Sequence, residues 1–104
     1  MDFRELEERV VAFRNARDWA KYHTSKNLAI SAAVELGELL EHFQWESDGE
    51  ILEAVKNPAK KEAIADEIAD VVIYLTLLAH ELGIDAGRAV ERKLRKNEGK
   101  YPEK

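Results

Sequence analysis

The stretch "VVIYLTLLA", residues 71–79, decides the fold, because a helix built from it has no polar face. At the α-helical rise it spans roughly 14 Å, about half of a bilayer's hydrocarbon thickness, so it is a core helix and not a membrane span. Every side of this helix needs cover, which one small bundle barely provides. We therefore predict a homo-oligomer, a dimer or a tetramer, that buries the helix between subunits. The alternative is a fully central helix in a monomer.

The rest of the chain favours an all-α bundle of four to five helices in a single domain, residues 1–104. Five glycines and two prolines offer breaks between helices, and little of the sequence alternates as a strand would. Thr24 or Ser25 is expected to cap the second helix, Asn57 with Pro58 to open the fourth, and Gly83 to close it. The expected helices cover residues 2–21, 26–45, 51–55, 58–82 and 85–97.

Composition excludes several classes of function. The chain has no cysteine, which removes thiolate nucleophiles, zinc-finger ligand sets and redox pairs. A net charge of -5 argues against a nucleic-acid groove, although the carboxyl end is locally basic and could meet phosphate. The amino terminus is charged from Asp2 and lacks the apolar segment of a signal peptide. We expect a cytoplasmic protein with neither nucleic acid nor a membrane as partner.

Two pairs of carboxylates lie within apolar segments: Glu35 and Glu38 in "ISAAVELGEL", and Glu67 and Asp70 in "ADEIADVVIY". Residues three apart share a helix face, so two such helices side by side would gather four carboxylates. Like charges about 5 Å apart repel by roughly 3 kcal/mol at an effective dielectric near 20, so this cluster needs cations. Ligand sets made only of oxygen select hard divalent ions, Mg²⁺ first and Mn²⁺ next.

Other interpretations of the carboxylates remain open. Spacing alone is weak evidence, because Glu5 and Glu8 of the first helix repeat it. Ferritin-like di-iron sites need a Glu-x-x-His, with a spacing of three, on two helices. His42 lies four residues after Glu38, so this spacing argues against a di-iron site. A rival from another class is a non-catalytic helical module that dimerises through residues 71–79. A nucleotide sensor that binds without turnover is a third possibility.

Three stretches carry a resemblance to a known family: "RDWAKYHTSKNLAISAAVELGELLEHFQW", "EIADVVIYL" and "KLRKNEGKYP". Together they resemble the MazG-type, all-α nucleoside triphosphate pyrophosphohydrolases, particularly the single-domain branch that contains the dCTP pyrophosphatases. The family's metal motif is Glu-x-x-Glu on one helix and Glu-x-x-Asp on another. The matching residues here are Glu35, Glu38, Glu67 and Asp70.

The resemblance implies hydrolysis of a nucleoside triphosphate between its α and β phosphorus atoms, with Mg²⁺ held by the four carboxylates. We expect Glu35 and Glu38 to be the catalytic pair, with Glu35 accepting the proton of the attacking water. The resemblance also implies phosphate or sugar contacts from Lys26, Asn27, Lys93, Asn97, Lys100 and Tyr101, and a base pocket lined by Trp19, His23, Trp45 and Tyr74. Without the family, the tail is a solvated helix end and the aromatic residues are core or interface.

One position departs from the family's pattern. Members that cleave dCTP carry a histidine that touches the base, whereas this sequence has Val10. A valine cannot hydrogen-bond, so it offers no group that a wrong base would leave unpaired. We therefore expect a broader housekeeping hydrolase that removes noncanonical or excess nucleotides, without strict selectivity for cytosine.

Overall fold

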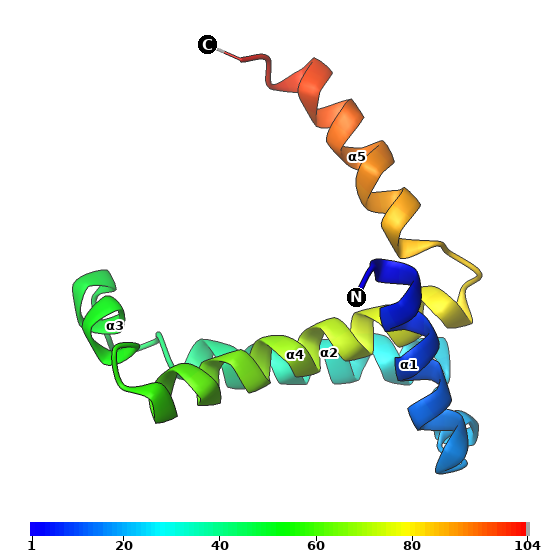
Figure 1. The fold of residues 1–104 in the computed structure, drawn as a ribbon, viewed down its shortest axis with the longest axis horizontal. Helices are drawn as coiled ribbons and strands as arrows, with labels where there is room; N and C mark the ends of the chain where they lie inside the picture. Colours follow the sequence, from blue (N-terminus) through cyan, green and yellow to red (C-terminus); the bar gives the residue numbers. More distant parts are fainter. Residues whose placement is uncertain (104) are drawn as a thin grey trace.

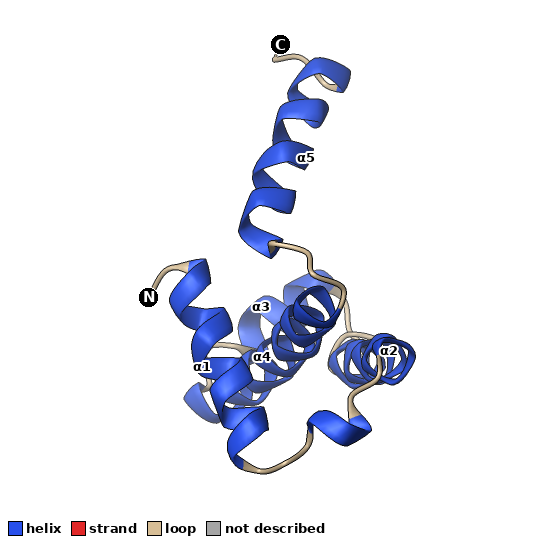
Figure 2. Cartoon of the chain, turned by 90° about the vertical axis from the view of Figure 1, so that its right-hand side faces the viewer, coloured by secondary structure: helices blue, strands red, loops and turns tan. Residues whose placement is uncertain are grey.

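The computed structural model describes residues 1–103, and that part of the chain contains helices and no strand. The elements are α1 (Phe3–Ala16), a short 3₁₀ helix η1 (Ala20–Tyr22), α2 (Ser25–Glu41), α3 (Asp48–Ala54), α4 (Pro58–Glu81) and α5 (Ala86–Lys100). α4 lies at the centre, with α1 and α2 on different sides of it (Figures 1 and 2). The predicted all-α bundle is confirmed.

α2 and α4 run antiparallel and form the main packing contact of the chain (Figure 1). Lys60 near the start of α4 reaches His42 just after α2, with 2.9 Å between Nζ and Nδ1. Apolar side chains of both helices fill the interface, and Leu28 of α2 is fully buried. Burying one leucine stabilises a fold by about 1.5–3 kcal/mol, so these few side chains contribute much of the stability.

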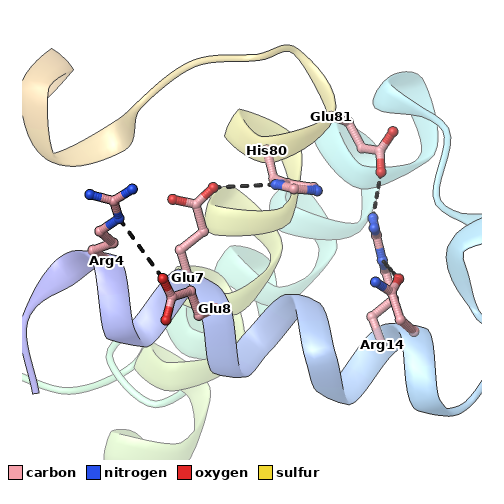
Figure 3. Close-up of polar contacts among 7 residues, drawn as sticks. Arg4, Glu7, Glu8, Arg14, His80 and Glu81 are labelled. Atoms are coloured by element: carbon pink, nitrogen blue, oxygen red, sulfur yellow. Dashed lines mark hydrogen bonds and ion pairs between the residues drawn. The ribbon is translucent and has the colours of Figure 1, made fainter.

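One ion pair and one side-chain hydrogen bond tie α1 to the carboxyl-terminal end of α4 (Figure 3). Arg14 is only 5% exposed, and its guanidinium pairs with the carboxylate of Glu81. Glu7 pairs with His80, with 3.3 Å between Oε1 and Nδ1. A buried guanidinium is costly unless a carboxylate compensates it, so the contact between Arg14 and Glu81 fixes where α1 lies on α4.

α1 ends at Ala16, so the prediction that it continues to residue 21 is wrong. Asp18 adopts a left-handed φ of 56°. Its N–H bonds the carbonyl of Asn15, and the N–H of Trp19 bonds the carbonyl of Arg14. These two bonds form a Schellman motif, which usually requires glycine and which aspartate tolerates better than most residues. The motif turns the chain away from the helix axis.

Other helix ends follow their caps. Thr24 caps α2 and Asn57 caps α4, both as predicted. α2 ends before the predicted Trp45 and α3 begins earlier than predicted, for one reason: Ser47 and Glu50 form a capping box. The capping residue needs extended backbone, so the chain must leave α2 before it. α5 continues beyond the predicted residue 97 to residue 100.

α5 projects away from the other helices and buries none of its side chains (Figures 1 and 2). The radius of gyration is 16.4 Å, whereas a compact domain of this length has about 13 Å. Within the apolar stretch of α4, Thr76 and Leu77 are buried but Leu75 is half exposed. One chain therefore leaves part of its apolar surface uncovered. None of the helices in residues 1–103 combines the length and apolar character that a bilayer span needs.

Replacing Glu81 by Ala should lower the free energy of unfolding by about 1.5–3 kcal/mol, the range for a hydrogen bond to a charged group. The loss arises because the buried guanidinium of Arg14 then lacks its partner. Glu53→Ala is the matched control, because Glu53 pairs with Lys56 on the surface, where ion pairs contribute about 0–1 kcal/mol. Urea denaturation at one protein concentration measures both. Equal effects would contradict a structural role for the buried pair.

Candidate functional site

Three carboxylates converge where α2 faces α4. Glu35 and Glu38 come from one face of α2 and Glu67 from α4, and one oxygen of each lies within 4.8 Å of the others. Asp70, one turn further along α4, lies outside this group. Its charge nevertheless raises the pKa of both Glu35 and Glu67, so it is an electrostatic neighbour of the cluster. Helix periodicity therefore brings three of the four predicted carboxylates together and leaves Asp70 one turn away.

Burial removes water from the carboxylates of Glu35 and Glu67, so their negative charge is poorly compensated. The Oε2 atoms of Glu35 and Glu67 are both buried and have no hydrogen-bond partner in the part of the chain that the structure describes. Burial raises the pKa of Glu35 above its ordinary 4.5, as do the hydrogen bond and the charge of Glu38. Burial and the charge of Glu38 likewise raise the pKa of Glu67, against a smaller opposite effect of His42. Glu35 and Glu67 therefore lose their protons less readily than ordinary glutamates do.

A divalent cation fits this donor set. Two buried carboxylate oxygens that have no partner in the described residues, next to a third carboxylate, supply hard oxygen ligands of the kind that Mg²⁺ and Mn²⁺ bind. An unsatisfied buried acceptor costs free energy, and a bound cation would remove that cost together with the repulsion. Glu38 is the most exposed of the three, so the cluster is open to solvent on its side.

An aromatic cavity of about 550 Å³ lies between α1 and α4. Trp19, His23 and Tyr74 line it, which are three of the four residues predicted for the base pocket. His23 meets Tyr74 edge to face, with ring centroids 6.3 Å apart. Burial and the charge of Arg14 lower the pKa of His23, which favours the neutral ring. Val10, the predicted departure from the family, lies in the same wall.

The cavity and the carboxylates are neighbours along α4. Tyr74 follows Asp70 by four residues, and Asp70 follows Glu67 by three, so the three side chains lie on one helix face. A ring held in the cavity would therefore project its substituents along this face toward the carboxylates. The arrangement suits a ligand with a flat ring at one end and negative charge at the other.

Several predicted ligand contacts lie elsewhere in the single chain. Trp45 is 83% exposed beyond the end of α2 and does not line the aromatic cavity. Lys26 and Asn27 lie in the first turn of α2, where the Asn27 amide donates to the carbonyl of Tyr22 over 3.2 Å. The predicted tail contacts lie on α5 or directly after it, away from the carboxylates (Figure 1): Lys93, Asn97, Lys100 and Tyr101. Their predicted roles stay predictions.

The sequence interpretation missed Arg14, which also lines the aromatic cavity. A signal was present, because Arg14 follows Val10 by four residues and so continues the apolar stripe of α1. The contact of Lys60 with His42 was missed as well. No local sequence pattern predicts this contact, because it joins residues from two different helices.

Known proteins resemble this chain in sequence. A sequence model of the MazG-like family matches residues 30–104. The chain belongs to the MazG-like family. This MazG-like chain is 40% identical over 90 residues to dCTP pyrophosphatase 1 of Rattus norvegicus and 39% identical to that of Homo sapiens. Each alignment covers 86% of this chain and 53% of the relative, so the chain spans about half the length of the curated relatives it matches.

The MazG-like fold is also found in a solved structure. The crystal structure of a pyrophosphatase from Archaeoglobus fulgidus DSM 4304 superposes with a TM-score of 0.83 at 45% sequence identity. The superposition covers 96% of this chain and 92% of that one. The resemblance inferred from the sequence, in family and in fold, is therefore confirmed.

Replacing Glu35 by Gln should stabilise the metal-free MazG-like chain near pH 7. The folded-state pKa of Glu35 lies above 4.5, so its ionisation costs stability as the pH rises through that folded pKa, and the amide avoids the cost. The stability advantage of Glu35→Gln over wild type should vanish as the pH falls toward about 4.5. Thermal unfolding in EDTA across this range measures it. Glu62→Gln, at an exposed position on α4, is the control, and an equal pH trend there would contradict the assignment.

Proposed function

We propose that this chain hydrolyses nucleoside and deoxynucleoside triphosphates to the nucleoside monophosphate and pyrophosphate, with Mg²⁺, or alternatively Mn²⁺, as cofactor. The observation that carries the proposal is the convergence of carboxylates from α2 and α4 beside an aromatic cavity. The activities of the relatives support it, since these proteins are dCTP pyrophosphatases and a pyrophosphatase.

In this proposal the two parts of the site divide the work. The carboxylates that would hold the metal are Glu35, Glu38, Glu67 and Asp70. The metal, when bound, neutralises phosphate charge and polarises the phosphorus under attack. Trp19, His23 and Tyr74 bind the base by its flat face and so orient the phosphates along α4 toward the carboxylates. Positioning of this kind is the larger part of phosphoryl-transfer catalysis.

Glu35 is the proposed proton acceptor for the attacking water. Its carboxylate is less exposed than that of Glu38, and its raised pKa makes it a stronger base than an ordinary glutamate. Glu38, at the open side of the cluster, would help to orient the water and the metal. This assignment agrees with the catalytic pair expected from the sequence.

We also infer that the enzyme is a homo-oligomer, a dimer or a tetramer. Exposed apolar side chains on α2 and α4 support this, as do the large radius of gyration and a helix α5 without buried residues. An assembly is the arrangement in which α5 could bring its lysines to the carboxylates of a neighbouring subunit. The proposed cellular role is the removal of noncanonical or excess nucleotides in the cytoplasm.

Replacing Glu38 or Glu67 by Gln should reduce pyrophosphate release by about 100-fold or more, because each change removes one negative ligand of the metal that would neutralise the phosphate charge in the transition state. The assay covers the eight common nucleotides with Mg²⁺ or Mn²⁺. Glu62→Gln is the control and should keep full activity. Absence of release by wild type with every nucleotide would refute the enzyme, and a nucleotide-dependent rise in melting temperature would then favour a sensor.

Wild type should show values of kcat/KM for dCTP, dTTP, dATP and dGTP that lie within about 10-fold of one another, because Val10 cannot hydrogen-bond any base. Val10→Asn places a donor and an acceptor in the same wall and should widen the spread between bases. Val11→Asn, at the next position of α1 and not among the residues that line this cavity, is the control. A wild-type preference of about 1000-fold for one base would show that another group in the cavity reads its edge.

A further inference from the structure

A cationic pair stands at the far end of the packing between α2 and α4. Lys60 and His42 lie 2.9 Å apart, Nζ to Nδ1, and both side chains are partly buried. A lysine ammonium has donors only, so Lys60 donates to Nδ1 of His42 and the imidazole keeps its proton on Nε2. The pair therefore holds one positive charge and leaves one further N–H donor on the ring.

The pair extends the face that carries the candidate site. On α4, Tyr74, Asp70, Glu67 and Lys60 recur at spacings of four, three and seven, which keeps them on one side of the helix. On α2, His42 follows Glu38 by four residues. At the helical rise, Asp70 lies about 6 Å from Tyr74 along the axis, and Lys60 lies about 10 Å beyond Glu67.

This order matches the order of groups in a nucleoside triphosphate. The aromatic cavity comes first, the carboxylates second and the cationic pair last. With the base in the cavity and the α-phosphate at the carboxylates, the β- and γ-phosphates extend toward Lys60. A lysine supplies the compact positive charge that a phosphate binds.

Charge balance favours the same assignment. The carboxylates and the phosphates are both negative, so the terminal phosphates need positive charge beyond a metal. The lysines of α5 lie away from the cluster of their own chain (Figure 1), whereas Lys60 belongs to the helix that carries Glu67.

We propose that Lys60, positioned by its contact with His42, binds the terminal phosphates of the substrate and the pyrophosphate released from them. Lys60 is then a phosphate-binding residue and His42 a positioning residue. The inference rests on the proposed function, because it assigns the leaving group of that reaction.

Calorimetric titration of the full chain with inorganic pyrophosphate, in the presence of Mg²⁺, tests the assignment without turnover. Lys60→Met should weaken pyrophosphate binding by about 10- to 100-fold, the loss expected when a charged hydrogen bond is removed. Lys61→Met removes the same charge from an exposed neighbouring position and should change binding by less than about 2-fold. Lys60→Arg keeps the charge and should retain most of the affinity.

Binding of dCMP separates a phosphate contact from a general loss of structure. It should be unchanged in Lys60→Met, because the monophosphate does not extend to this end of the site. His42→Leu should weaken pyrophosphate binding with dCMP binding intact, and His42→Gln, whose amide oxygen can accept from Lys60, should restore it. Wild-type affinity for pyrophosphate in Lys60→Met, or equal losses for both ligands, would overturn the inference.

Turnover distinguishes this inference from the function on which it rests. If wild type releases pyrophosphate from triphosphates and Lys60→Met does so with an unchanged KM, only the role of Lys60 is overturned. If wild type binds pyrophosphate through Lys60 but cleaves no triphosphate, the proposed function fails and the phosphate site stands.

Discussion

Repulsion between carboxylates held inside a helix interface is the constraint on which the rest of the structure depends. Glu35, Glu38 and Glu67 lie within a few ångströms of one another, and the Oε2 atoms of Glu35 and Glu67 are buried without a hydrogen-bond partner among residues 1–103. Packing of α2 on α4, with Leu28 fully buried, must hold this unfavourable group in place. The packing of the fold therefore offsets a repulsion that lowers its stability and that a bound cation would relieve.

The helix positions and the convergence of the carboxylates could be predicted because both depend on local periodicity. A spacing of three places Glu35 with Glu38, and the caps Thr24, Asn57 and Gly83 state where helices begin or end. The end of α1 could not be predicted, because Asp18 has a left-handed backbone conformation that aspartate adopts only occasionally.

The other features that the sequence did not predict depend on contacts between segments that are distant in the chain. Arg14 could be expected on the surface from its charge alone, and its burial depends on Glu81, 67 residues away. Lys60 and His42 likewise meet only because α2 and α4 are antiparallel. The predicted roles of Trp45 and of the α5 residues depend on geometry between subunits, which neither local periodicity nor one chain contains.

The Schellman motif at Asp18 separates α1, which lines the aromatic cavity, from α2, which carries two of the clustered carboxylates. It ends α1 and leads the chain toward α2, and these two helices lie on different sides of α4 (Figure 2). α1 contributes Val10 to the aromatic cavity, whereas α2 contributes Glu35 and Glu38 to the carboxylate cluster. Substitutions in α1 can thus reshape this wall of the cavity without replacing any of the clustered carboxylates. A change in the cavity and retention of the carboxylate cluster are therefore compatible where α1 and α2 are concerned, while α4 contributes to both.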